Sequence, residues 1–190
     1  MILIIILIVL VVLAALLVGI DNRLVALRQN CNQAFADIDV QLKQRHDLIP
    51  NLVETVKGYA AHEKGTLEAV IQARNAAVSA EKTRDPAAMS QAEGVLGTAL
   101  GRLIALSEAY PDLKANTNFQ QLQSELSDIE NKLAAARRFF NNAVGEYNTA
   151  REQFPAAMFA SMFGFGPRTF FDVGEENRAT LETAPQVKFN

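Results

Sequence analysis

The side chains of this chain best suited to catalysis or metal binding are two histidines and a single cysteine. His62 is followed by Glu63, as in the HExxH helix of zinc proteases, but the position of the second histidine holds Thr66. His46 lies in an Arg-His-Asp run at 45–47, and consecutive residues of a helix point to different faces. The sequence has no Ser-His-Asp order, no phosphate-binding glycine loop and no CxxC pair. We therefore predict a protein that is not an enzyme, without catalytic, cofactor-binding or metal-binding residues.

Polar side chains on the first and last helices of the predicted fold form a second kind of candidate site. This candidate interaction face consists of Asp47, Asn51, Glu54, Arg137 and Asn141. If the two helices run antiparallel, acidic and amide groups of one can meet basic and amide groups of the other. One interpretation is a solvated face, whose salt bridges contribute about 0–1 kcal/mol each. The other is a clamp that fixes the register of the helices and that a partner protein could also bind.

These helices must be attached to an apolar segment at the N-terminus, residues 2–20, which is dominated by Ile, Leu and Val and has no charge. As a helix it is about 28 Å long at about 1.5 Å per residue, which matches the hydrocarbon core of a bilayer. Insertion is favoured by about 5 kcal/mol. A cleaved signal peptide is the alternative, but it would begin with Lys or Arg, and the small pair Ala14 and Ala15 lies inside the run. We predict a retained transmembrane helix.

The charges that follow this helix indicate its orientation. Arg23 and Arg28 lie just behind it, and positively charged residues beside a membrane helix prefer the cytoplasm. We therefore expect the N-terminus outside and the remaining chain in the cytoplasm. The single cysteine, Cys31, cannot form an intramolecular disulfide, which fits a reducing compartment. Cys31 is expected to pack as a small apolar side chain on the first helix.

Outside the apolar run the chain is rich in helix-forming residues and lacks alternating β-branched runs, which indicates an all-α domain. Apolar residues recur every three or four positions from Leu24 to Ala60, as in coiled coils. Pro50 interrupts this stripe without changing its phase, although proline costs about 3 kcal/mol inside a helix. We expect one long helix over 21–62 that continues the transmembrane helix. Two helices with a break at residues 48–49 are the alternative.

The rest of the domain is predicted to form three further helices. Asp85 and Pro86 mark the start of the second of them, as N-cap and first helical residue. Short connections join neighbouring helices antiparallel, so the prediction is an antiparallel four-helix bundle over 21–154. An even number of passes brings the end of the last helix back toward the membrane. The expected ranges are 64–82, 86–110 and 117–154.

The two middle helices each have an apolar stripe, and the second of them also has a row of glycines. Arg74 falls on the apolar stripe of the helix over 64–82. Gly94, Gly97 and Gly101 share roughly one face of the next helix. Since each glycine costs about 1 kcal/mol relative to alanine, we expect these glycines to allow two backbones to pack closely. A mobile helix is the alternative interpretation.

The segment after the bundle, residues 155–190, is aromatic at its start and mostly irregular and acidic at its end. The sequence has 11 Phe, and more than half of them lie between 154 and 171. Such a patch would be a membrane or interaction site if exposed, whereas it would be a packing contact if folded onto the base of the bundle. Residues after Val173 are expected to be disordered or extended. The candidate membrane or intersubunit contacts are Phe159, Met162, Phe163, Phe165, Phe170 and Phe171.

Three long segments give this chain a family resemblance. They are DIDVQLKQRHDLIPNLVETVKGYAAHE at 37–63, EAYPDLKAN at 108–116 and RRFFNNAVGEYN at 137–148. Together with the apolar N-terminus and the Phe-rich ending they resemble the bacterial LemA family over nearly the whole chain to residue 171. The departures are Phe35, where Trp is common, and Phe140, where Tyr is common. The resemblance implies a single-pass inner-membrane protein with its N-terminus outside and a cytoplasmic helical bundle, and it implies no catalytic residues.

The net charge and the family resemblance together limit the possible partners and functions. The net charge of −3 provides no basic surface for nucleic acid. The expected partners are the lipid bilayer, further copies of the chain and other membrane proteins, without a cofactor. We expect a non-enzymatic, membrane-anchored helical scaffold that self-associates and organises the membrane or its neighbouring proteins. The alternative is an adaptor or regulator of a membrane enzyme such as a protease.

Overall fold

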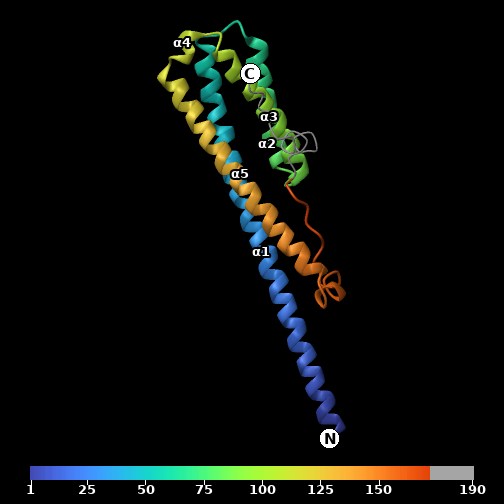
Figure 1. Ribbon diagram of the computed structural model, residues 1–190. Helices are drawn as coiled ribbons and strands as arrows, with labels where there is room; N and C mark the ends of the chain where they lie inside the picture. The colour runs from blue at the N-terminus through green and yellow to red at the C-terminus, as the bar shows by residue number, and fades with distance from the viewer. Residues whose placement is uncertain (172–190) are drawn as a thin grey trace, which may run out of the picture. The chain divides into compact units, whose positions relative to one another are not determined.

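The computed structural model describes residues 1–171, and it divides them into two compact units. The anchor unit comprises residues 1–38 and 135–170, and the bundle unit comprises residues 39–134 with Phe171. All regular structure in the described residues is helical, which confirms the all-α prediction (Figure 1). The expected disorder after Val173 concerns residues outside the described part. The helices are α1 (Ile2–Lys57), α2 (Lys64–Glu81), α3 (Pro86–Ser107), α4 (Pro111–Lys114) and α5 (Thr117–Glu152), followed by a 3-10 turn (Ala156–Met158).

Helix α1 continues the apolar run without a break, as predicted. Residues 2–13 are exposed along their whole length, and α1 is the one helix among the described residues that is long and apolar enough to cross a membrane. Helix α1 ends at Lys57, before the expected end at residue 62. The chain turns there through tightened hydrogen bonds, such as Tyr59 N to Val56 O at 3.0 Å. The prediction of one long helix is therefore confirmed, with an earlier end.

Pro50 lies inside α1, and the bundle unit compensates for the hydrogen bond that proline removes. Because proline has no N–H, the carbonyl of His46, four residues earlier, loses its helical donor. The Arg74 side chain on α2 donates to this carbonyl from Nε at 2.7 Å. An arginine on the apolar stripe of α2 thus satisfies the carbonyl that Pro50 leaves open, which explains why the helix continues through the proline.

The bundle unit has an apolar core to which each of its helices contributes. Its α1 portion provides Leu52 and Val56, and the α5 portion provides Phe119 and Leu126. Asp85 caps α3, with its side chain accepting from Ala87 N at 3.1 Å. The helix expected over 86–110 is divided into α3 and the short α4, which begins at Pro111. The other core residues of α2, α3 and α4 include Leu67, Val70, Ala73, Ala77, Leu96, Ala99, Leu100, Leu103 and Leu113.

The glycines of α3 do not serve the predicted close approach of two backbones. A Cβ atom added at Gly94 or Gly101 would meet no atom within 4 Å. At Gly97 it would lie 3.6 Å from the Arg45 guanidinium, an ordinary van der Waals distance. Within the chain itself the expectation is therefore wrong for the first two positions, because both face open space there, and the spacing of three and four residues identified only a shared face.

The anchor unit pairs the first part of α1 with the last part of α5. The rings of Phe35 and Phe140 meet edge to face with their centroids 5.5 Å apart. Leu24, Cys31 and Ala34 of α1 are buried in this unit, which follows the predicted apolar stripe. Beyond α5 the chain passes a cis peptide bond before Pro155, makes the 3-10 turn, and turns again at Gly164, where φ is +74°.

Candidate functional site

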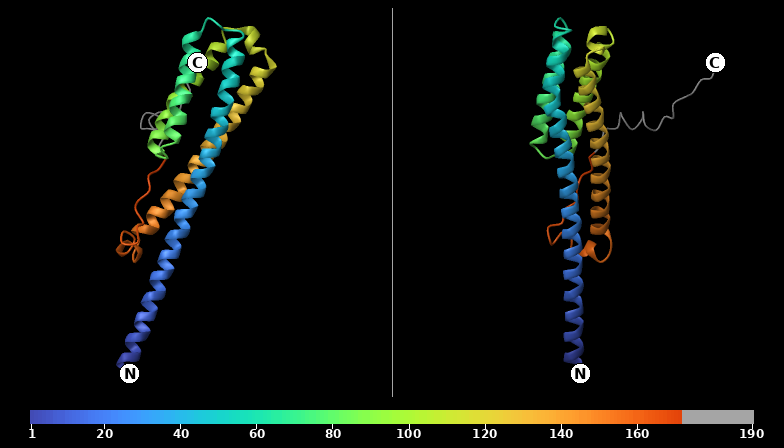
Figure 2. Two further views of the ribbon diagram at one scale, coloured as in Figure 1. Left: turned by 180° about the vertical axis from the view of Figure 1, so that it is seen from behind. Right: turned by 90° about the vertical axis from the view of Figure 1, so that its left-hand side faces the viewer.

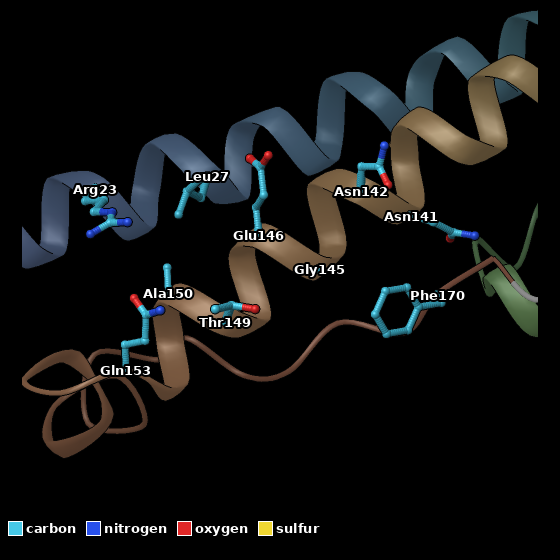
Figure 3. A pocket seen from close by; sticks show the side chains of 10 residues that line it. All are labelled: Arg23, Leu27, Asn141, Asn142, Gly145, Glu146, Thr149, Ala150, Gln153 and Phe170. Carbon is cyan, nitrogen blue, oxygen red and sulfur yellow. The ribbon is translucent and has the colours of Figure 1, made fainter.

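A polar groove with a volume of about 750 Å³ lies in the anchor unit. Arg23 and Leu27 line it from α1, and the ring of Phe170 lies beside Gly145 at its other edge (Figure 3). Most of the remaining lining is polar, which suits a polar or mixed ligand rather than a purely apolar one. The α5 residues that complete the lining are Asn141, Asn142, Glu146, Thr149, Ala150 and Gln153.

The chain after the 3-10 turn is fastened to α5 by a group of hydrogen bonds. Tyr147 donates from its hydroxyl to the Gly166 carbonyl at 2.8 Å. Asn148 donates to the Arg168 carbonyl at 2.8 Å and accepts from Arg168 N at 3.0 Å. Arg151 donates to the carbonyl of Phe165 at 2.8 Å. Four hydrogen bonds to backbone groups therefore fix residues 165–168 against the last turns of α5.

Side chains of α1 complete this attachment. The guanidinium of Arg28 lies over the Phe165 ring, 4.9 Å from its centroid, a cation–π contact. Arg168 donates from Nη2 to Asn32 Oδ1 at 2.7 Å. As a result Phe165 is buried although it lies in a segment without regular structure.

The residues just before this fastened part behave differently, since their large apolar side chains face outward. Phe154 is 81% exposed, Met158 62% and Met162 79%, although none of them is polar. Phe159 and Phe163 stack on one another with their centroids 6.4 Å apart. We call residues 154–163 the aromatic loop. It carries several large exposed apolar side chains outside α1, interspersed with the buried Ala156 and Ala160, which marks it as an interaction surface.

Cys31 lies in the core of the anchor unit and is fully buried. Burial raises the pKa of its thiol, against a smaller lowering by the charge of Arg168. We therefore expect maleimide to label Cys31 at least about tenfold more slowly than an exposed thiol, because the thiolate is the reactive species. The control is the Gln33→Cys variant in a Cys31→Ala background, with an exposed cysteine on the same helix. Equal labelling rates in the folded protein would contradict the burial of Cys31.

The bundle unit contains a buried charge cluster of Arg45, His46 and Glu93. Arg45 donates from Nη1 to Glu93 Oε2 at 2.6 Å, and His46 Nε2 lies 2.6 Å from Glu93 Oε1. All three residues are at most 4% exposed. At the rim, Arg45 Nη2 donates to Glu130 Oε1 at 2.9 Å, and His46 Nδ1 lies 3.4 Å from Glu81 Oε2. One carboxylate of α3 thus binds two neighbouring side chains of α1, although consecutive residues were expected to diverge.

Electrostatics favour the ionised form of Glu93 despite its burial. Burial by itself raises the pKa of this carboxyl, but the hydrogen bond with His46 and the positive charge of Arg45 outweigh that effect. The net pKa of Glu93 therefore lies below its ordinary value of 4.5. Arg45, His46 and Glu93 pair with one another away from solvent, although Arg45 Nε has no hydrogen-bond partner among the described residues, so the cluster joins α1 to α3 in the bundle unit.

A second groove, on the surface of the bundle unit, has a volume of about 390 Å³. Asp47 and Asn51 line it from α1. Its charged side chains pair locally: Lys43 binds Asp47 at 2.7 Å, and Lys132 binds Asp128 at 2.7 Å. The other lining residues are Gln44, Leu48, Glu125 and Ile129.

Comparison with known proteins adds the family. The LemA family profile matches residues 34–189, which is well over half of the chain. The chain belongs to the LemA family. The residues that match the LemA profile include the charge cluster, the groove residues of α5 and residues 165–168, which are hydrogen-bonded to α5.

Relatives of this LemA-family chain include magnetosome proteins. It is 25% identical to the magnetosome protein MamQ of Magnetospirillum gryphiswaldense over 173 residues, 79% of this chain and 64% of the relative. It is 25% identical to the protein LemA of Metamycoplasma hominis over 169 residues, 88% of this chain and 75% of the relative. The match spans less than two thirds of the length of MamQ. None of these names specifies a reaction. Family membership and the exposed apolar helix together indicate a membrane protein.

The predicted interaction face of this LemA-family chain is distributed over both units. Asp47, Asn51 and Glu54 belong to the bundle unit, where Glu54 pairs with Lys57 at 3.1 Å on the exposed side of α1. Arg137 and Asn141 belong to the anchor unit, where Asn141 lines the larger groove. A joint face of all five residues remains a prediction.

The predicted aromatic contacts of this LemA-family chain separate into two groups. Phe165 and Phe171 are each only 2% exposed, so their rings are covered by the chain itself. Met162, Phe163 and Phe170 are exposed, and Phe159 is half-buried. The first group fits the interpretation of a segment folded onto its own chain, and the second stays available for a partner.

The histidines hold no metal site in the described residues. His46 is part of the charge cluster and His62 is exposed. Residues 1–171 contain no group of three or more His, Cys, Asp and Glu side chains placed to hold a metal ion.

Sequence reasoning missed Glu93, the carboxylate that both Arg45 and His46 contact. A signal was available, because Met89, Glu93, Leu96 and Leu100 share the apolar stripe of α3, and an acidic residue on such a stripe needs a buried partner. Arg74 carried the same kind of signal on α2. Tyr147 and Asn148 belong to the motif at 137–148, but their role toward the backbone of residues 165–168 could not be read from it.

Proposed function

We propose that this protein is a membrane-anchored helical scaffold that self-associates and organises the membrane or neighbouring membrane proteins. The observation that carries the proposal is α1, because an exposed apolar run of membrane-spanning length continues as the same helix into folded residues, with no linker between them. The charged side chains with the greatest catalytic potential pair with one another in the buried cluster of Arg45, His46 and Glu93. The magnetosome relatives, which are named for a structure and not for a reaction, are consistent with this role.

The mass of the full-length protein in mild detergent tests self-association. We expect a defined assembly larger than the 20.8 kDa chain by light scattering after size-exclusion chromatography. The assembly should persist over a tenfold range of protein concentration if it is specific. A monomer at every concentration would contradict self-association and would favour an adaptor that acts on other proteins.

An adaptor or regulator of a membrane enzyme is the second candidate, favoured by the groove that Asp47 and Asn51 line. A photo-crosslinking amino acid at Asn51 in the full chain should then capture a defined membrane protein in cells. The matched control is the same amino acid at exposed Gln72, on α2 of the same unit and outside the groove. Identical products from both positions would indicate nonspecific capture and would contradict a role of the groove.

We further propose a bacterial inner-membrane location with the N-terminus outside and the bundle unit in the cytoplasm. Arg23 and Arg28 behind the apolar run support this orientation, since positive charges near a membrane helix remain cytoplasmic. A fluorescent protein fused to the C-terminus should fluoresce, and an alkaline phosphatase fused there should be inactive. The opposite pair of results would reverse the orientation.

A further inference from the structure

We propose that the aromatic loop, residues 154–163, inserts its exposed side chains into the membrane surface beside α1, which gives the anchor unit a second contact with lipid. This inference rests on the proposed anchoring of α1 in a bilayer. It concerns a different part of the chain, whose role neither the family nor the names of the relatives assign.

The chemistry of the loop fits lipid. From Phe154 to Phe163 the chain has no charged residue, and Ser161 is its one hydroxyl side chain. Phe154, Met158 and Met162 are largely exposed. The described residues thus leave bulky apolar groups in contact with water at one place, an arrangement that is favourable only if another apolar phase covers them.

The level of the aromatic loop along α1 indicates that the apolar phase covering it is the bilayer. The contact of Phe35 with Phe140 sets the level at which α1 and α5 pair in the anchor unit. From Phe140 to Phe154 the chain advances about 21 Å along α5, and the same distance from Phe35 leads back along α1 to Asp21. Asp21 directly follows the apolar run 2–20. The loop therefore begins at the level where α1 would leave the membrane.

Two further contacts agree with this level. Arg23 of α1 and Gln153 of α5, the residue before the loop, line the same groove. After the loop the chain returns along α1, since the Phe165 ring lies under Arg28 and Arg168 reaches Asn32. Figure 2 shows the orange to red chain that follows α5 beside the N-terminal half of α1. The aromatic loop is thus the part of the α5 side that reaches closest to the apolar run.

A flanking charge also suits a membrane surface. Arg23 of α1 lines the groove together with Gln153, so its long basic side chain lies near the start of the loop, where it can extend toward phosphate groups. The loop itself is uncharged, so apolar burial should drive its insertion. We expect insertion to occur in neutral as well as in anionic bilayers.

Tryptophan fluorescence tests the proposal with little background, because the sequence contains no Trp. Full-length Phe163→Trp is reconstituted in phosphatidylcholine vesicles with lipids brominated at shallow or deep positions of their acyl chains. The matched control is Phe139→Trp, since Phe163 is 46% and Phe139 57% exposed in the same unit, and residue 139 lies about 22 Å from the loop along α5. Leu13→Trp inside the apolar run tests the anchor itself. Phe154→Trp provides a second position in the loop should Phe163→Trp fail to fold.

The expected result is blue-shifted emission of Phe163→Trp and quenching by shallow brominated lipids at least about twofold stronger than for Phe139→Trp. Quenching of Leu13→Trp with equal, weak quenching of both other variants would overturn the inference and leave the anchor intact. Blue-shifted emission of Phe163→Trp without quenching by lipid would also overturn it, because protein, such as a second copy, would then cover the ring. No quenching of Leu13→Trp would overturn the anchor and the inference together.

Discussion

Replacing Glu93 by alanine is expected to lower the free energy of unfolding of the bundle unit by about 3 kcal/mol. The substitution removes the carboxylate that binds both Arg45 and His46 and leaves the Arg45 charge buried. The expected loss lies at the lower end for broken buried ion pairs because Arg45 keeps Glu130 as a partner at 2.9 Å. Urea unfolding of the full-length protein in mild detergent, followed by circular dichroism, measures the loss.

Glu54→Ala is the matched control for this experiment. Glu54 forms an exposed ion pair with Lys57, so its replacement should change stability by at most about 1 kcal/mol. Equal effects of the two substitutions would mean that the buried cluster contributes no more than a surface pair, which would contradict its role in holding the helices.

The same cluster predicts a dependence on pH, measured with Glu93→Gln. Because the pKa of Glu93 is lowered in the folded protein, its ionised form stabilises the fold at pH values above its unfolded value of about 4.5. This stabilisation is lost as the pH falls through the lower, folded pKa. The difference in stability between wild type and Glu93→Gln should therefore be full at pH 7 and shrink below pH 4.5. A difference that is constant between pH 3 and pH 7 would exclude Glu93 ionisation as its source.

Replacing Arg74 by methionine should destabilise the bundle unit by about 1–3 kcal/mol, the cost of a buried acceptor without a donor. The Arg74 side chain donates to the His46 carbonyl, which Pro50 deprives of its helical partner. In a Pro50→Ala background the N–H of residue 50 can donate to this carbonyl. The same Arg74→Met substitution should then cost at most about 0.5 kcal/mol, since a helical hydrogen bond replaces the lost one.

A double-mutant cycle over residues 50 and 74 measures this coupling by urea unfolding. Pro50→Ala alone should raise stability, because a helical N–H returns. The control Arg102→Met removes an exposed arginine of α3 and should have little effect in either background. A loss from Arg74→Met that is the same with proline and with alanine would contradict compensation, and it would assign the effect of Arg74 to its charge or packing.

Local sequence signals predicted most of the helical architecture. The apolar run, the stripe that keeps its phase across Pro50 and the Asp85-Pro86 start signal each depend on neighbours within a few residues, and each appears in the structure. The end of α1 at Lys57 and the separate short α4 were missed, because helix ends depend on turn hydrogen bonds that the apolar period does not encode. The prediction that the α3 glycines share a face was correct. The close packing inferred from that face was not found within the chain, since glycines that face open space and glycines that face a close neighbour have the same spacing in the sequence.

What the sequence by itself determined about this protein is which faces of its helices are apolar, where an anchor can cross a membrane and to which family the chain belongs. Periodicity determines the direction in which a side chain points, because a helix has a fixed number of residues per turn. Only the tertiary structure decided which side chains meet there. Glu93 lies 48 residues from Arg45, and Arg74 lies 28 residues from His46. The attachment of residues 165–168 to Tyr147, Asn148 and Arg151 likewise depends on how the chain returns, and no local pattern specifies that return.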